Sequence, residues 1–223
     1  MTKFGETGWD DEGGGGGKKF VSSKDLYLNL KDGSNEMRLV TKPYVYLVHK
    51  YKKDEKEQGY GKRVYCASVN GDCPLCKMGN KPKKRWYVGV ISRDTGTYKV
   101  LDISYSVFTA IQKLNKNTQR FGDPTKYDIN IEVDRKSTGP NGYYQVQALP
   151  KEPLSAADQA IKDSVDLTFL QNKVTPPTAE AVQARLDKLN GTTPDAAPKG
   201  TPVVSTADDE DDDSEFPAYD SNA

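Results

Sequence analysis

Short runs in which apolar and polar side chains alternate fill the chain between Met37 and Leu149. The clearest run is 127–133, where tyrosine, isoleucine and valine occupy every second position. A period of two is typical of half-buried strands, and β-branched and aromatic residues favour strands further. Runs of this kind lie at 42–50, 85–91, 98–103, 127–133 and 143–149. We therefore predict five strands.

Turn signals join four of these strands into two hairpins. Asp94-Thr95-Gly96 separates the second strand from the third, and Gly139-Pro140-Asn141-Gly142 separates the fourth from the fifth. Alternation also gives the first strand two unlike faces. The face expected to enter the core holds Val45, Leu47 and His49. The opposite face holds Lys42, Tyr44, Tyr46 and Lys50.

One short helix is predicted at 106–114, where Val107, Ala110, Ile111 and Leu114 follow helical spacing. It lies between the third and fourth strands. Five strands with a helix at that point match the order of the OB-fold, a small Greek-key barrel whose open face binds single strands. We expect a mainly β (α+β) fold built on a five-stranded OB-fold barrel.

Helical patterns return after Pro150. Ser155-Ala156-Ala157-Asp158 fits a capping box, and an apolar stripe runs from Ala179 to Leu189 and is closed by Asn190-Gly191. We expect both helices to pack on the barrel. The predicted parts are a flexible glycine-rich segment (1–17), an OB-fold core (18–150) with an inserted zinc subdomain (about 50–84), a helical extension (151–191) and a disordered acidic tail (192–223).

Composition agrees with a folded body that carries unfolded ends. The chain has 223 residues, of which 35% are hydrophobic, a low share for a fully globular protein. It has no run of 18 apolar residues, and its first ten residues lack a basic region followed by an apolar one. We expect neither a membrane span nor a secretory signal. We therefore expect the protein to lie in the reducing cytosol, which is the host cytoplasm if the protein is viral.

The formal net charge of zero hides a strong segregation of charge. From residue 18 to residue 149 there are 25 Lys and Arg against 13 Asp and Glu, whereas 205–223 carries eight acids and no base. A basic body with an acidic tail indicates a polyanion-binding protein whose tail recruits partners or competes with the ligand. The alternative is a tail that only aids solubility. The predicted tail residues are Asp208, Asp209, Glu210, Asp211, Asp212, Asp213, Glu215 and Phe216.

The single histidine and the three cysteines of the chain lie within 28 positions, as His49, Cys66, Cys73 and Cys76. One His with three Cys is a closed ligand set for structural zinc. A lone histidine can instead be a packed imidazole, and CxxC is also a redox motif. The turn-rich segment around Cys73-Pro74-Leu75-Cys76 favours a metal knuckle over a redox helix.

A catalytic metal is disfavoured, because four protein ligands leave no open position for water. The zinc deaminase signature is also missing, since Tyr51 stands where its glutamate would follow His49. We predict one structural Zn²⁺ and no enzymatic activity.

Basic and aromatic side chains interleave between residues 42 and 99. Cations bind phosphates, and aromatic rings stack on unpaired bases without reading sequence. For any one tyrosine the alternative is an ordinary sheet residue whose ring packs in the core. The predicted DNA-binding residues are Lys42, Tyr44, Tyr46, Lys50, Lys62, Arg63, Tyr65, Lys83, Lys84, Arg85, Tyr87, Arg93, Tyr98 and Lys99.

In its order of His, Cys and CxxC within a basic, aromatic-rich OB-fold, followed by helices and an acidic tail, the chain resembles the zinc-containing single-stranded DNA-binding proteins of T4-like bacteriophages. The resemblance implies a DNA cleft between zinc subdomain and barrel, and a tail that contacts replication and recombination proteins. It implies Tyr44, Tyr46, Tyr65, Arg85 and Tyr87 as cleft residues. The ligand spacing differs, and the basic N-terminal segment that drives self-association along DNA in that family has no clear counterpart.

The leading hypothesis is a sequence-independent single-stranded DNA-binding protein for phage DNA replication, recombination and repair. The alternative is a zinc-ribbon transcription or protein-interaction factor, which would prefer duplex DNA or protein. A metal-dependent nuclease finds little support, because the carboxylates do not cluster around the histidine.

Overall fold

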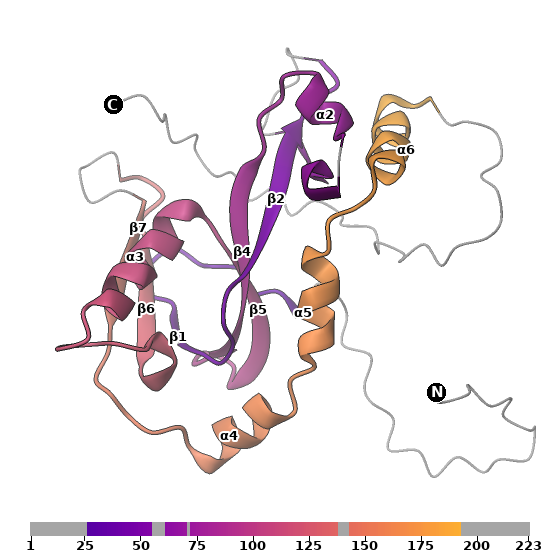
Figure 1. Ribbon diagram of the computed structural model, residues 1–223. Helices are drawn as coiled ribbons and strands as arrows, with labels where there is room; N and C mark the ends of the chain where they lie inside the picture. Colours follow the sequence, from indigo (N-terminus) through magenta and orange to yellow (C-terminus); the bar gives the residue numbers. More distant parts are fainter. Residues whose placement is uncertain (1–25, 55–60, 71, 138–142, 193–223) are drawn as a thin grey trace, which may run out of the picture.

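A mostly antiparallel sheet forms the centre of the protein, as seen in a computed structural model that describes residues 26–54, 61–70, 72–137 and 143–192 (Figure 1). Seven strands form within these residues. They are β1 (Glu36–Leu39), β2 (Tyr44–Tyr51), β3 (Lys62–Tyr65), β4 (Lys83–Ser92), β5 (Thr97–Ile103), β6 (Asp128–Val133) and β7 (Tyr144–Ala148). The order is β3-β2-β4-β1-β6-β7, and β5 pairs with β4.

Strands β1 and β2 act as one interrupted strand along β4. Leu39 pairs with Val90 and Tyr44 pairs with Tyr87, so both short strands follow the same partner. Pro43 cannot donate to a ladder, and the Oγ1 of Thr41 accepts the Gly89 N–H at 2.8 Å in the gap. A Cβ at Gly89 would lie 2.7 Å from the Thr41 methyl group, so this close approach requires glycine.

The sequence prediction of five strands is corrected to seven. The five predicted strands correspond to β2, β4, β5, β6 and β7, and the hairpins β4–β5 and β6–β7 are confirmed. It missed β1 and β3, because each has only four residues and shows too little alternation. A closed five-stranded barrel is not seen. No ladder joins β5 to β7 in the described part of the chain, and the sheet is open.

Five α-helices and two 3₁₀ turns accompany the sheet in the described residues. They are η1 (Ser68–Asn70), α2 (Pro74–Lys77), α3 (Tyr105–Lys116), η2 (Pro124–Lys126), α4 (Ala156–Asp163), α5 (Leu167–Val174) and α6 (Ala179–Asn190). The predicted α3, α4 and α6 are confirmed. Ser155 caps α4 by accepting the Asp158 N–H, and Gly191 ends α6 with φ of 74°. Helix α5 was not predicted. No helix in the described residues could cross a membrane.

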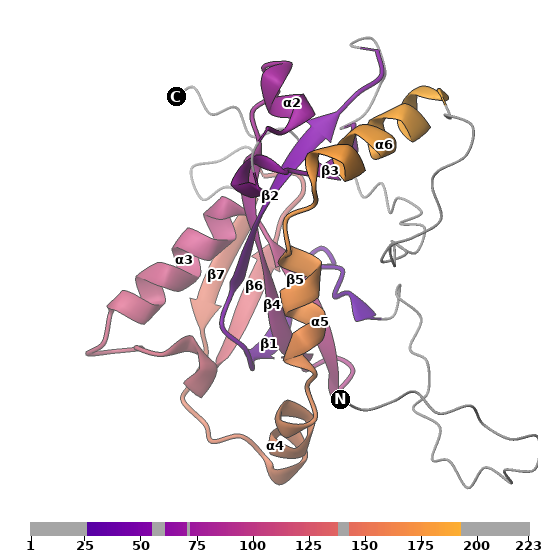
Figure 2. The same ribbon diagram turned by 45° about the vertical axis from the view of Figure 1, so that its right-hand side comes forward.

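Three buried clusters hold these elements together. The largest lies between the sheet and α3, where Trp86 stacks on Phe108 at 4.0 Å. The other two lie under α5 and α6. Helices α4, α5 and α6 follow one another along one side of the sheet up to α2 (Figures 1 and 2). The helical extension therefore spans the sheet rather than capping one end of it.

Several sequence predictions fall outside the described residues. These are the segment 1–17, the 139–142 turn and the tail residues from Asp208 to Phe216.

Candidate functional site

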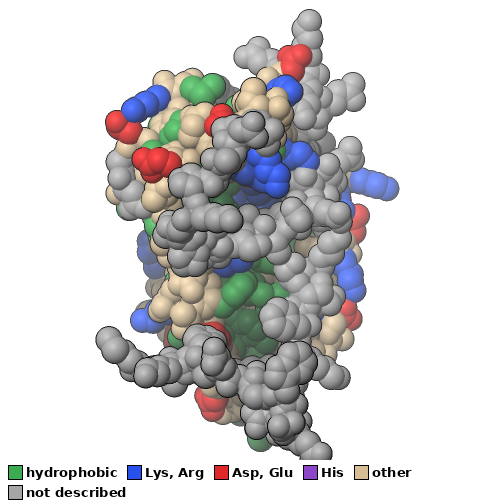
Figure 3. All heavy atoms as spheres, turned by 90° about the vertical axis from the view of Figure 1, so that its right-hand side faces the viewer, with side chains coloured by type: hydrophobic (Ala, Val, Ile, Leu, Met, Phe, Trp, Pro, Cys, Tyr) green, Lys and Arg blue, Asp and Glu red, His purple; other side chains and the backbone are tan. Residues whose placement is uncertain are grey.

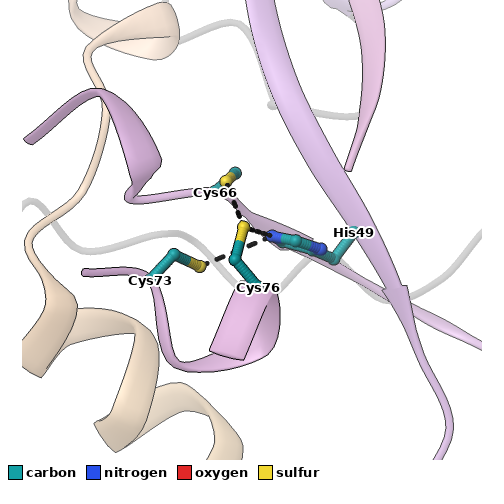
Figure 4. Close-up of side chains that lie close together, drawn as sticks. All are labelled: His49, Cys66, Cys73 and Cys76. Atoms are coloured by element: carbon teal, nitrogen blue, oxygen red, sulfur yellow. Dashed lines mark hydrogen bonds between the residues drawn. The ribbon is translucent and has the colours of Figure 1, made fainter. Parts of the chain in front are cut away.

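The four predicted metal ligands converge on one point (Figure 4). The Nε2 of His49 lies 3.4 Å from the Sγ of Cys73 and 3.7 Å from that of Cys76, and the Sγ atoms of Cys66 and Cys76 are 3.6 Å apart. Tetrahedral zinc with ordinary bond lengths separates two sulfurs by about 3.8 Å and sulfur from nitrogen by about 3.6 Å. The cluster therefore has the size of a tetrahedral metal site.

Local structure brings these ligands together from three segments. His49 is buried on β2, and Cys66 follows β3, which pairs with β2. Cys73 is the residue before α2, and Cys76 lies within it. Pro74 at the first position of α2 has the backbone angle that starts a helix. The hairpin and the short helix thus fix both ligand pairs.

A neighbouring asparagine fixes the ring of His49. The Oδ1 of Asn80 lies 3.3 Å from Nδ1 of His49, and the Asn80 amide donates to the carbonyl of Lys50 at 2.9 Å. With a proton on Nδ1, the lone pair is on Nε2, which faces the sulfurs. Burial lowers the pKa of His49, so the ring is kept neutral. This is the form that binds metal.

The thiols lie in unlike environments. Burial raises the pKa of Cys76 to about 12, with a further rise from the hydrogen bond to Cys66. At Cys73 burial raises the pKa, but hydrogen bonds with the backbone N–H groups of Cys76, Ala67 and Leu75 and with the Cys66 thiol together lower it below its ordinary value. N–H groups directed at a sulfur stabilise its thiolate, which is the metal-binding form. The backbone around this CxxC segment therefore stabilises a thiolate at Cys73.

Helix α6 closes the metal subdomain, which we define as β3, η1, α2 and the connections up to β4. Val182 and Leu186 of α6 are buried against Cys66, Cys73 and Leu75. The Tyr51 hydroxyl donates to Asn190 Oδ1 at 2.8 Å. The predicted apolar stripe of α6 thus packs on the metal subdomain, whereas a place on the barrel was expected.

The side chains of β2 that point away from His49 and the metal cluster belong to a second surface. Residues paired in an antiparallel ladder point to the same face. The registers of β2 with β3 and β4, and of β4 with β5, therefore gather nine predicted residues, which we call the tyrosine face. They are Tyr44, Tyr46, Lys50, Arg63, Tyr65, Lys83, Arg85, Tyr87 and Tyr98.

Tyrosine rings stack in the middle of this face. Tyr46 lies parallel to Tyr87 at 4.5 Å, and Tyr65 is tilted against Tyr46 at 5.2 Å. The hydroxyls of Tyr65 and Tyr87 are 2.8 Å apart. Burial raises the pKa of both Tyr46 and Tyr87, so they stay protonated. The stack is a preformed aromatic platform.

The expected orientation of β2 is wrong in one respect. Tyr46 and Tyr87 are only 5% and 6% exposed, whereas Val45, expected in the core, is 53% exposed. Tyr46 and Tyr87 are buried because α5 packs over them, and Leu170 of α5 is fully buried against this cluster. Tyr46 and Tyr87 therefore form the buried layer of the platform. Tyr44 and Tyr65 are half-buried and lie nearer to solvent.

Basic side chains lie at the end of the tyrosine face nearest the metal subdomain. Burial lowers the pKa of Lys50, and the positive charges of Lys83, Arg63, Arg85 and Lys52 lower it further. The cations crowd one another here, so this end of the face carries a concentration of positive charge. Figure 3 shows Lys and Arg side chains grouped in the upper half of the side viewed there, above an apolar area.

An acidic residue at the centre of this face was not predicted. Asp102 on β5 pairs in register with Tyr87. It accepts from Nη1 of Arg63 at 2.7 Å, from Nε of Arg85 at 2.8 Å and from the Tyr46 hydroxyl at 2.9 Å. The register of the β4–β5 hairpin sets this position, because Ser92 pairs with Thr97 across four residues and this brings Asp102 opposite Tyr87.

Five predicted DNA-binding residues lie elsewhere. The registers place Lys62, Lys84 and Lys99 on the opposite face of the sheet. Lys42 lies between β1 and β2. Arg93 directly follows β4, eight residues beyond Arg85 and about 26 Å away at strand spacing. Its guanidinium donates to Asp128 at 2.6 Å and to Asp158 at 2.9 Å. Arg93 thus ties α4 to the sheet.

Comparison with known proteins gives one partial match. No protein-family model matches the chain. A protein of Escherichia phage T5 named "probable ssDNA-binding protein" is 30% identical over 105 residues. The match covers 42% of this chain and 40% of the phage protein, so the chain spans less than half the length of that relative. Over that part, the chain is similar to a phage protein named for single-stranded DNA binding.

Proposed function

We propose that the protein binds single-stranded DNA without sequence preference and carries out no catalysis. The observation that carries the proposal is the tyrosine face, where a stack of aromatic rings and a group of cations lie on one side of four adjoining strands. Cations release counterions from phosphates, and each base stacked on an aromatic ring contributes about 1–3 kcal/mol. Duplex DNA hides its base faces, so rings favour single strands. The partial match to the phage T5 protein supports the same ligand.

We propose an OB-type arrangement for the binding module. With β1 and β2 taken as one strand, the pairs formed by β4, β5, β6 and β7 follow the OB order, with α3 between β5 and β6. OB-folds bind oligonucleotides on their second and third strands and the loops beside them. Here those strands are β4 and β5, and the loop after the first strand is the metal subdomain.

The bound metal is proposed to be one structural Zn²⁺. Three sulfurs and one imidazole nitrogen suit zinc, and no fifth group among the described His, Cys, Asp and Glu residues joins the cluster. His49 and Cys66 would bind from β2 and the end of β3, and Cys73 and Cys76 from the knuckle. The metal would hold the long loop before β4 rigid beside the tyrosine face.

The wider role is proposed from the resemblance to T4-like phage proteins and from charge. The protein would coat single strands during phage DNA replication, recombination and repair in the host cytoplasm. The acidic tail from Asp208 to Phe216 would recruit replication and recombination proteins and compete with DNA for the basic body. The division into segments at 1–17, 18–150, 151–191 and 192–223 belongs to the same proposal.

Fluorescence titration tests the ligand. The chain contains 13 tyrosines and two tryptophans, whose emission reports stacking on bases. Titration with oligo-dT and with a duplex of equal length, over a salt series, should give strong quenching and a steep salt slope with the single strand only. Equal or tighter binding to the duplex would remove the proposed function and favour a zinc-ribbon transcription factor.

A further inference from the structure

A carboxylate lies among the cations of the tyrosine face, where charge alone makes it unfavourable for a polyanion ligand. The Asp102 side chain is 15% exposed, and it receives both Nε of Arg85 and Nη1 of Arg63. Its third side-chain partner among the described residues is the Tyr46 hydroxyl, which donates a hydrogen bond at 2.9 Å. Asp102 therefore connects the two arginines to the aromatic stack.

The bonds to Arg85 fix the plane of its guanidinium. Its Nε lies 2.8 Å and 3.1 Å from the two Asp102 carboxylate oxygens, and its Nη2 lies 3.5 Å from the Asp102 carbonyl. These contacts occupy one edge of the Arg85 guanidinium, the edge formed by Nε and Nη2. The side chain is 23% exposed, so part of it remains open to solvent. An arginine held in this way loses little freedom when it meets a phosphate.

Arg63 and Tyr46 are linked through the same carboxylate. Arg63 is 49% exposed and reaches Asp102 from β3, whereas Arg85 reaches it from β4. The Tyr46 ring, whose hydroxyl donates to Asp102, lies between Tyr65 and Tyr87 in the stack. One carboxylate thus sets the positions of two phosphate-binding candidates relative to the aromatic stack and to its half-buried ring, Tyr65, on which a base would stack.

We propose that Asp102 is a positioning residue for single-stranded DNA binding: it orients Arg85, and with it Arg63 and Tyr46, so that cations and rings match the spacing of phosphate and base. The inference rests on the proposed function. It reverses the expectation from charge. Removal of a negative charge from a polyanion-binding face should tighten binding, whereas removal of a positioning group should weaken it.

The sign of the effect of Asp102→Asn on oligo-dT affinity tests the proposal. We expect binding to weaken about fivefold to tenfold, as ordered donors become mobile. The matched control is Asp94→Asn, which removes the same charge from the exposed β4–β5 turn, where Asp94 pairs with Lys31. This control should bind equally or slightly more tightly. If wild type binds and Asp102→Asn binds equally or more tightly, the inference is overturned and the proposed function stands. If wild type does not bind, the proposed function itself fails.

A double-mutant cycle shows whether Asp102 acts through Arg85. Arg85→Lys keeps the charge and loses the fork, so it should weaken binding by a similar factor. The double variant should lose no more than about twofold beyond either single variant, whereas additive losses would contradict the inference. Circular dichroism checks that each variant is folded at the assay temperature. If Asp102→Asn does not fold, Asp102→Glu decides: it keeps the charge but shifts the carboxylate, and unchanged affinity would overturn the proposal.

Discussion

The two faces of β2 meet different partners and are held in different ways. On one face, His49 joins three cysteines, and four ligand atoms within 4.8 Å of one another define a single point. On the other, Tyr46 is held by ring stacking and by Asp102, and the neighbouring basic side chains reach the surface. Since side chains alternate along a strand, one segment serves both faces. A metal behind β2 would therefore stiffen the strand that presents the rings.

The largest expected effect is on the metal face. Cys73→Ser should abolish stoichiometric zinc binding and lower the free energy of unfolding by about 4 kcal/mol when free zinc is a thousand times its Kd for wild type. Metal analysis and thermal unfolding measure both changes. Chelator followed by added zinc is the control on wild type, and it should lower and then restore the unfolding temperature. Unchanged stability after complete metal removal would contradict a structural role.

Alanine substitutions at two matched leucines, one in α5 and one in α6, should affect the two faces of β2 differently. Leu170 and Leu186 are 0% and 3% exposed, so each change to alanine should cost about 3 kcal/mol of unfolding free energy. Leu186→Ala should also weaken zinc binding in a chelator competition, because Leu186 packs on Cys66 and Cys73. Leu170→Ala should leave zinc affinity unchanged, since it packs on Tyr46 and Tyr87. Equal effects of both variants on zinc affinity would erase the distinction between the faces.

A smaller effect concerns the rings themselves. Tyr65→Ala should weaken oligo-dT binding by about 1–3 kcal/mol, the contribution of one stacked base. The matched control is Tyr105→Ala, since Tyr105 is 67% exposed at the start of α3, close to Trp86 and away from the tyrosine face. Equilibrium fluorescence titration measures both variants. A larger loss from Tyr105→Ala than from Tyr65→Ala would assign base stacking to another surface.

Much of the fold could be predicted because its longer elements repeat a clear period. The alternation at 127–133 predicted β6, and the Asp94-Thr95-Gly96 turn predicted the β4–β5 hairpin, both of which are confirmed. The four-residue strands β1 and β3 were too short to show a pattern. Helix α5 was missed because Leu167, Phe169 and Leu170 form no extended stripe. Its burial of Tyr46 depends on contacts between distant parts of the chain, which local patterns do not encode.

For the candidate site, the metal cluster was accessible to sequence reasoning and the binding surface only partly so. Residue type restricts the metal ligands strongly, since the chain has one histidine and three cysteines. Lysines and arginines are too common for type alone to choose among them. Strand register made the choice, placing Arg85 on the tyrosine face and Lys84 on the opposite face. Asp102 was overlooked because an acid does not fit the charge pattern expected of a DNA-binding surface.

Photocrosslinking tests the central claim, that the tyrosine face binds single strands, most directly. An oligo-dT that carries 5-iodouracil is irradiated in complex with the full chain, and crosslinked peptides are identified by mass spectrometry. The account predicts crosslinks at Tyr44 and Tyr65, which are half-buried on the tyrosine face, and their loss when unmodified oligo-dT competes. Crosslinks confined to the opposite side of the sheet, around Tyr105 of α3, would contradict it.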